Sequence, residues 1–185
     1  MDTNKRFQSN SAGPLNVESD YSIRYCTEDD LEGVIEVNET ELPEDYPYFF
    51  YKSILDNYPN AFMVACPKDR PKRIIGYVMW RIEKKPILGN LKVAKKGHLV
   101  SIAVLKMYRR NNIATKLLLK SMPEIKKHGI TSFVLEVRVS NFSAINLYKK
   151  LGFKIDSIKK HYYRDDENAY YMVRALNKNI DFEDK

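Results

Sequence analysis

Two side chains that can exchange protons near neutral pH, His98 and Glu136, stand inside apolar segments typical of strands. Histidine titrates near neutrality, and a strand-interior carboxylate should have a raised pKa if it is desolvated. Such a pair can remove a proton from an amine, which is general-base chemistry. The alternatives are a structural histidine with satisfied hydrogen bonds and, for Glu136, an ion pair with Arg138 or a lysine.

The alternation of side chains along a strand indicates how this pair could meet. Alternation puts His98 on one face of its strand with Val100 and Ile102, and it puts Glu136 on one face of its own strand with Val134. If the two strands are neighbours, the imidazole and the carboxylate converge. One histidine and one glutamate are too few ligands for a metal ion, so no metal site is predicted.

A second candidate site is a phosphate-binding turn. The segment follows a buried strand and opens a helix, where unpaired backbone N–H groups and the positive end of the helix dipole come together. A solvated helix start is the alternative. The candidate residues are Arg109, Arg110, Asn111, Asn112, Ile113, Ala114 and Thr115.

A third candidate lies in the next helix. Asn141 is suited to cap a helix that runs through Leu151, and Gly152 would end it. Within this helix Tyr148 carries a phenol that is a proton donor at neutral pH, so it is the candidate acid for a leaving group. A core aromatic with a satisfied hydroxyl is the alternative.

The helices and strands that must position these groups follow from the spacing of apolar residues and from the residues that end helices and strands. Thr27 with Asp30 forms a capping box for the first helix, and Pro123 is expected to kink or shorten the third. The predicted order implies a mixed sheet with helices on both faces. The elements are a strand 21–26, a helix to about 40, a helix 49–57, strands 61–66 and 74–82, a basic loop 83–96, a strand 97–104, a helix 113–129, a strand 132–139, a helix 141–151, and strands 153–157 and 169–174.

Composition limits the class of protein. The chain has 185 residues, of which 44% are hydrophobic and 30% charged, which fits one soluble domain at 21–176 between polar tails at 1–20 and 177–185. Cys26 and Cys66 lack metal or disulfide spacing and should be buried as small hydrophobes. No apolar run could span a membrane or serve as a secretory signal, so a cytoplasmic location is expected.

The phosphate turn and the Tyr148 helix together resemble the GNAT acetyltransferase superfamily. Its phosphate motif is Gln/Arg-x-x-Gly-x-Gly/Ala, which Arg109 and Ala114 match while Asn112 stands in the place of the central glycine. Asn is the least costly substitute if this position needs a positive φ. The run Asn141-Phe-Ser-Ala-Ile-Asn-Leu-Tyr148-Lys-Lys-Leu-Gly-Phe153 resembles the superfamily's Asn-x-x-Ala-x-x-Leu-Tyr-x-x-x-Gly-Phe element.

The resemblance implies acetyl-CoA as cosubstrate and a GNAT fold, a mostly antiparallel sheet with one splayed parallel strand pair. In that family backbone groups of the first splayed strand hold the pantetheine and thioester, which maps to Ile102, Ala103 and Val104. The family's Asn and Tyr lie along the pantetheine and the thioester sulfur, and these roles fall on Asn141 and Tyr148. Lys150 would approach the phosphates.

Two loops narrow the resemblance to archaeal protein N-terminal acetyltransferases. The run Glu41-Leu-Pro-Glu-Asp-Tyr46-Pro-Tyr-Phe-Phe-Tyr51 resembles their substrate loop, and the run from His161 to Tyr170 resembles the tyrosine hairpin facing it. The similarity covers 21–176. It implies that Tyr46 and Tyr163 hold an incoming N-terminus and that Glu41 and Leu42 line the first-residue pocket. Surface packing of the tyrosines is the alternative.

The predicted activity is therefore transfer of the acetyl group of acetyl-CoA to the α-amino group of protein or peptide N-termini. Within enzymes, acetylation of lysine or a small amine is the alternative. Outside enzymes, the net charge of +7 and the basic segment 83–96 favour a ribosome- or RNA-binding module on the same fold. A ribosome could also be a partner of the enzyme, while no specific nucleic acid and no membrane are expected.

Overall fold

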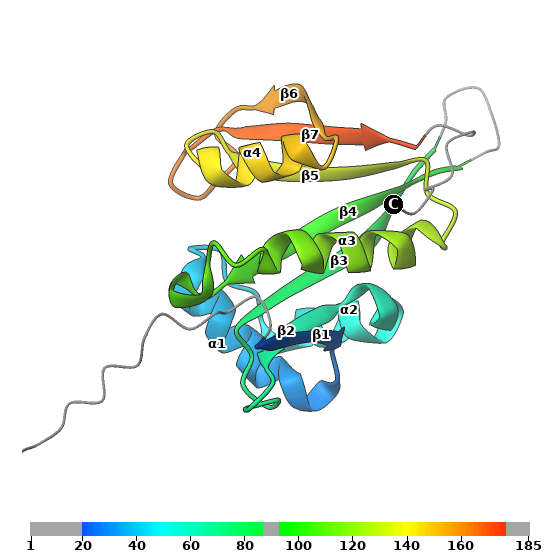
Figure 1. The fold of residues 1–185 in the computed structure, drawn as a ribbon. Coiled ribbons are helices and arrows are strands. Elements are labelled where there is room, and N and C mark those ends of the chain that lie inside the picture. Colours follow the sequence, from blue (N-terminus) through cyan, green and yellow to red (C-terminus); the bar gives the residue numbers. More distant parts are fainter. Residues whose placement is uncertain (1–19, 87–92, 177–185) are drawn as a thin grey trace, which may run out of the picture.

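A computed structural model describes residues 20–86 and 93–176 as a sheet with helices on both faces (Figure 1). The polar tails expected at 1–20 and 177–185 fall outside the described residues, apart from Asp20. Within the described residues, no helix is long and apolar enough to cross a membrane.

Seven strands in the described residues form one sheet in the order β1-β2-β3-β4-β5-β7-β6. Every neighbouring pair is antiparallel except β4 and β5, which are parallel. The mixed, mostly antiparallel sheet with one parallel pair is thus confirmed. The strands are β1 (Tyr21–Tyr25), β2 (Met63–Pro67), β3 (Gly76–Pro86), β4 (Val93–Val104), β5 (Ser132–Arg138), β6 (Lys154–Lys159) and β7 (Ala169–Ala175).

The α-helices cover both faces of the sheet. One core cluster joins the sheet to α1 (Leu31–Glu41) and α2 (Tyr48–Asn57), and the other joins it to α3 (Ile113–Lys126) and α4 (Phe142–Lys150). Short 3₁₀ turns occupy Glu28–Asp30, Pro59–Ala61 and Lys106–Tyr108.

Several local predictions are confirmed. The capping box is present, with the Thr27 N–H donating to Asp30 Oδ2 at 2.8 Å, although the turn that it opens is a 3₁₀ turn before α1. Gly152 adopts a φ of 83° just after α4, as a helix-ending glycine does. Pro123 lies inside α3, which continues past it to Lys126 and ends before the expected residue 129.

The prediction of a basic loop at 83–96 was wrong. β3 continues to Pro86 and β4 begins at Val93, and the two strands pair through Glu83 opposite Lys96 and Lys84 opposite Lys95. Charged side chains do not prevent strand formation, because the ladder is built by backbone groups and the side chains can reach water. The segment 87–92 lies outside the described residues.

The prediction that Ile102 lies on the same face of its strand as His98 and Val100 was also wrong. β3 and β4 pair as Trp80 with Leu99 and then as Met79 with Ser101, so Val100 is an extra residue in a β-bulge. An extra residue reverses the alternation beyond it. Val100 accordingly packs with the α1 and α2 cluster, whereas Ile102 packs with the α3 and α4 cluster.

The parallel pair opens into a fork. In the described residues β4 pairs with β5 only at Lys96, Gly97 and His98, where His98 lies opposite Val134. Beyond this point the two strands diverge, as Figure 1 shows toward its left side. We call the place where they separate the fork, and the sequence-predicted base stands at its start.

Candidate active site

His98 and Glu136 meet at the fork. Glu136 lies two residues beyond Val134 on β5, and its Oε2 is 2.6 Å from His98 Nε2. Both side chains are only 9% exposed. The convergence inferred from strand alternation is therefore present, even though the bulge places Ile102 on the other face.

A second carboxylate holds the other side of the imidazole. Glu83 Oε1 lies 2.9 Å from His98 Nδ1, and Arg81 Nε lies 3.2 Å from the same nitrogen. The nitrogen cannot both donate to Glu83 and accept from Arg81. Because the carboxylate is nearer and Arg81 has its own 3.0 Å contact with Glu83, we assign the Nδ1 proton to Glu83.

The two carboxylates determine the charge of His98. Burial lowers the pKa of His98, but hydrogen bonds and charge from Glu136 and Glu83 outweigh it and raise the pKa above its ordinary value. In return the hydrogen bond from His98 lowers the pKa of Glu83 to about 2. The resting imidazole is thus biased toward its protonated form between two ionised carboxylates.

The raised pKa expected for Glu136 was wrong. Burial does raise it, but hydrogen bonds and charge from His98 and Lys159 reverse the effect and leave the pKa below its ordinary value. Lys159 of β6 contacts Glu136 Oε1, the oxygen that His98 does not use. Sequence alternation predicted the contact with His98, but it did not identify Lys159 as the lysine beside Glu136.

The phosphate-turn residues surround the N-terminus of α3. Asn112 adopts φ 57° and ψ 10°, in the left-handed region, so the Asn in the glycine place has the conformation for which Asn is tolerated. A helical hydrogen bond runs across this turn from Lys116 N to Asn112 O at 2.9 Å. The amides of Ile113, Ala114 and Thr115 precede it and have no acceptor within the helix.

Arg109 and Glu41 brace this turn. The Arg109 guanidinium contacts the Glu41 carboxylate, and its Nε donates to Val104 O at 3.0 Å. Glu41 Oε1 also accepts from Lys106 N at 2.6 Å. Glu41 therefore ties the end of α1 to the turn between β4 and α3, while Leu42 beside it packs against the α1 and α2 core.

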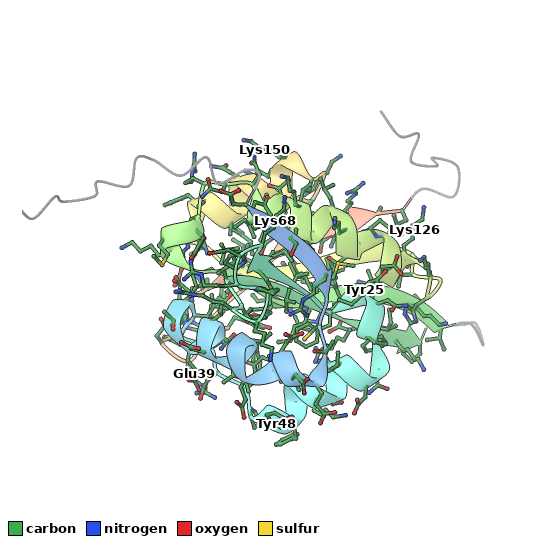
Figure 2. All side chains as sticks on the ribbon, turned by 60° about the horizontal axis from the view of Figure 1, so that its bottom comes forward. Tyr25, Glu39, Tyr48, Lys68, Lys126 and Lys150 are labelled. Atoms are coloured by element: carbon green, nitrogen blue, oxygen red, sulfur yellow. The ribbon has the colours of Figure 1, made fainter. Side chains whose placement is uncertain are left out.

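α4 places its candidate residues at two separate ends. Asn141 caps the helix and accepts from Ala144 N at 3.1 Å, while Tyr148 is buried with its ring centre 5.9 Å from that of Phe153. Burial raises the pKa of Tyr148, so its phenol stays protonated. Lys150 is exposed in the last turn (Figure 2), roughly 13 Å along the helix axis from Asn141.

The two tyrosine loops face each other across Arg138. The guanidinium lies 4.0 Å from the ring centre of Tyr163 and bonds Glu44 of the first loop at 2.6 Å. It also bonds Asp165 and Glu167 of the second loop at 2.7 and 2.8 Å. Arg138 thus joins both loops to the end of β5.

Tyr46 lies on the first loop beside α2. Its ring stacks on Phe50 at 4.8 Å between centres, and burial raises the pKa of its phenol. Burial raises the pKa of Tyr163 as well, so both hydroxyls are donors near neutral pH.

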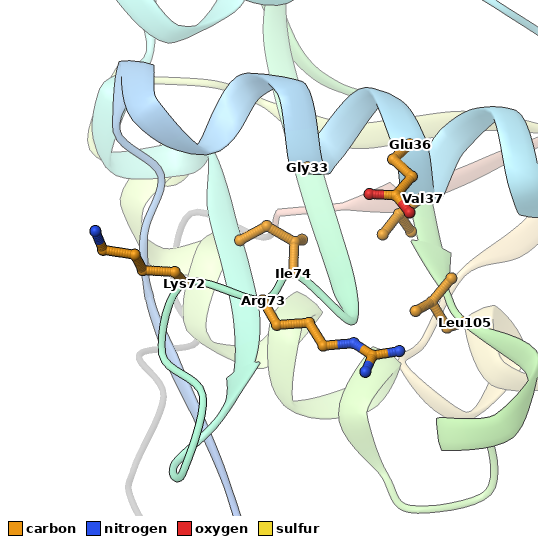
Figure 3. Close-up of a pocket in the computed structure, with 7 residues that line it drawn as sticks. All are labelled: Gly33, Glu36, Val37, Lys72, Arg73, Ile74 and Leu105. Carbon is orange, nitrogen blue, oxygen red and sulfur yellow. The ribbon is translucent and has the colours of Figure 1, made fainter.

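A small pocket of about 120 Å³ lies elsewhere, between α1 and the residues that precede β3 (Figure 3). None of the candidate site residues lines it, and we do not assign it to the reaction. Its lining residues are Gly33, Glu36, Val37, Lys72, Arg73, Ile74 and Leu105.

Four residues of the site were not identified from the sequence, although a lysine was one alternative partner for Glu136: Glu44, Arg81, Glu83 and Lys159. Glu83 was assigned to a loop, although continued alternation from Arg81 through Glu83 could have extended the strand. Glu44 stands within the loop that was singled out. Lys159 carries no local signal, because it is one of several lysine pairs in the chain.

The conformation of Asn112 gives a first prediction. Asn112→Gly should leave the unfolding free energy, and the KM for the acetyl-CoA that the sequence resemblance implies, close to wild type, since glycine accepts the left-handed region. Asn112→Val should destabilise the chain by about 1–2 kcal/mol and raise that KM. Urea unfolding and initial rates would measure both, and a valine variant indistinguishable from wild type would show that the turn does not need this conformation.

Comparison with known proteins assigns this geometry to a family. A family model described as the acetyltransferase (GNAT) family matches residues 25–153. An N-alpha-acetyltransferase of Sulfurisphaera tokodaii is 46% identical over 162 residues, which are 85% of this chain and 94% of that protein. The catalytic subunit NAA10 of the Arabidopsis thaliana N-terminal acetyltransferase A complex is 35% identical over 83% of this chain and 77% of its own.

Solved structures agree with this comparison. The crystal structure of Ard1 from Thermoplasma volcanium is 26% identical, with a TM-score of 0.72 over 85% of this chain and 99% of that one. Chaetomium thermophilum Naa20 in complex with a bisubstrate analogue is 25% identical, with a TM-score of 0.73 over 84% of this chain and 86% of its own.

Proposed function

The chain belongs to the acetyltransferase (GNAT) family, and on this basis we propose that it transfers the acetyl group of acetyl-CoA to the α-amino group of protein N-termini. The observation that carries the proposal is the His98–Glu136 pair at the fork between β4 and β5. Relatives named N-alpha-acetyltransferases, at 43–46% identity, support an N-terminal acceptor.

The residues present fit acetyl-CoA, which supplies an activated acetyl thioester when bound. Beyond His98 the described part of β4 has no ladder partner on its β5 side, so those backbone groups of the segment Ile102, Ala103 and Val104 that face this side can bond the pantetheine. The amides at the start of α3 suit the pyrophosphate. Arg110, which also has a positive φ of 67°, and Asn111 complete this turn.

The His98–Glu136 pair performs the proton removal. An α-amino group has a reference pKa of about 7.7–8.0, so part of it is neutral and able to attack near pH 7. The attacking nitrogen becomes positively charged when it bonds the acetyl carbon, and it must then lose a proton. Neutral His98 accepts this proton, directly or through a water, and Glu136 and Glu83 stabilise the imidazolium.

Tyr148 supplies the complementary proton. The departing thiolate needs a donor, and the buried, protonated phenol of Tyr148 is assigned to it. Asn141, at the start of the same helix, is assigned to the pantetheine. Lys150, in the last turn of α4, stays a candidate for approaching the cofactor's phosphates.

The acceptor peptide is assigned to the space between the two facing loops. Tyr46 and Tyr163 keep their hydroxyls protonated and can donate to the peptide backbone, while Leu42 borders the first residue. Glu41 is occupied by Arg109 and Lys106, so its contribution to the first-residue pocket is to fix the wall rather than to bind the side chain.

A second prediction tests the tyrosines. The double variant Tyr46→Phe with Tyr163→Phe should raise the peptide KM about tenfold, at about 0.7 kcal/mol for each lost hydrogen bond, with the KM for acetyl-CoA unchanged. Tyr48→Phe is the matched control, because Tyr48 is exposed on α2 at the outside of the molecule (Figure 2). Unchanged peptide KM and turnover in the double variant would remove this assignment.

The finer expectations from the sequence stay proposals. A single domain at 21–176, a cytoplasmic location and a ribosome as partner are consistent with an enzyme that modifies protein N-termini. Acetylation of lysine remains the second candidate acceptor chemistry, since any neutral amine that reaches the fork could attack.

The function is tested by measuring CoA release with acetyl-CoA and a library of short peptides that vary in the first two residues. Release that depends on peptide, with a preference set by the first residue, is expected. Release without peptide dependence, or none with any peptide, would refute the proposed function.

A further inference from the structure

Lys159 is a cation held against the base by contacts from three directions. It ends β6, and its ammonium contacts Glu136 Oε1. The same Nζ lies 5.1 Å from the ring centre of Tyr162 and 4.9 Å from that of Tyr171. A lysine side chain is flexible, so contacts with a carboxylate and two aromatic faces confine it.

The charged and titratable groups around the His98–Glu136 pair come from every element packed on it. Glu136 divides its two oxygens between the imidazole and the ammonium. The surrounding groups are Arg81 and Glu83 on β3, Lys96 on β4, Glu44 and Tyr46 on the first loop, Lys159 on β6, Tyr162 and Tyr163 on the second loop, and Tyr171 on β7.

We propose that Lys159 is a positioning residue whose ammonium shares the charge of Glu136 and so sets the pH range in which His98 is free to accept a proton. This inference rests on the proposed function, because it concerns the same proton transfer. Lys159 itself does not touch the reacting atoms. It acts on His98 through Glu136.

His98 and Lys159 compete for the carboxylate of Glu136. Glu136 Oε2 stabilises the imidazolium at 2.6 Å, while Lys159 on Oε1 offsets part of the same negative charge. Without Lys159 the whole charge of Glu136 would favour protonated His98, and proton acceptance would require a higher pH. Lys159 also helps to lower the pKa of Glu136. Its side chain is 42% exposed, so water weakens the effect.

The pH dependence of kcat tests the inference. In Lys159→Gln the acidic limb should move to higher pH by about half a unit to one unit, so that activity below the limb falls about three- to tenfold. The plateau at high pH should equal that of wild type. Lys159→Arg should restore the wild-type limb, and Lys160→Gln, at the exposed neighbouring lysine, should leave it in place.

A titration of His98 by NMR reports the same coupling without peptide or acetyl-CoA. The chain has three histidines, and the His98 signal is identified by its loss in His98→Gln. In Lys159→Gln this signal should titrate at higher pH than in wild type. An unchanged His98 titration, or a loss of activity equal at every pH, overturns the inference. Wild-type protein that transfers no acetyl group overturns the proposed function instead.

Discussion

Replacing His98 by alanine should lower kcat about 100-fold or more while the KM for acetyl-CoA stays near its wild-type value. We propose the imidazole as the group that takes the proton at the fork, and the carboxylates that contact its two ring nitrogens, those of Glu136 and Glu83, are not assigned to the cosubstrate. Steady-state kinetics with saturating peptide would measure the change. His128→Ala is the matched control, because His128 is exposed at the end of α3. A wild-type kcat in His98→Ala would refute the role.

Glu136→Ala should cause a loss of similar size, because the two side chains act as one unit across a 2.6 Å contact. For the same reason, the double variant should lose little more than either single variant. Equal unfolding midpoints would separate this effect from loss of folded protein. Multiplicative losses in the double variant would show that His98 and Glu136 act independently.

The pH dependence has a defined sign. His98 must be neutral to accept a proton and its pKa is raised, so kcat should increase as the pH rises through a value above 6.5. The contribution of His98 to the stability of the fold changes with pH in the opposite direction. The contacts of protonated His98 stabilise the fold fully below its ordinary pKa, and this contribution is lost as the pH rises through the raised value.

Arg138→Met should produce the second large effect, a loss of about 2 kcal/mol of stability together with at least a tenfold higher peptide KM. Arg138 is only 18% exposed and bonds Glu44, Asp165 and Glu167, so its loss removes the cation that joins the two facing loops. Urea unfolding and peptide kinetics would measure the two quantities.

Arg164→Met is the matched control for this variant. Arg164 links the same two loops through Asp45, but the two side chains are 87% and 66% exposed, and such surface pairs contribute little. It should therefore resemble wild type in both measurements. If Arg138→Met and Arg164→Met behave alike, Arg138 does not position the loops.

Most of the fold follows from local signals in the sequence. Hydrophobic periodicity found the helices, and alternation found His98 and Glu136 on strands that prove to be neighbours. The two errors in strand assignment have one physical origin, which is the register of pairing between β3 and β4. The bulge at Val100 depends on how β4 matches β3, and the strand character of Glu83 depends on pairing opposite Lys96.

The direction in which the pKa of Glu136 is shifted could not be predicted from the sequence either. Apolar neighbours of Glu136 suggested a raised pKa, whereas His98 and Lys159, from β4 and β6, lower it. Lys159 lies 23 residues from Glu136 in the chain, and only the pairing of β6 with β7 and of β7 with β5 brings it there. Long-range charge contacts of this kind leave no periodic trace in the sequence.

The most direct test of the central claim is to locate the transferred acetyl group by mass spectrometry. Two peptides of the same sequence with one internal lysine, one with a free and one with a blocked N-terminus, are incubated with the protein and acetyl-CoA. An acetyl group on the α-amino nitrogen of the free peptide and none on the blocked peptide is the expected result. Continued acetylation of the blocked peptide at its lysine would contradict the account.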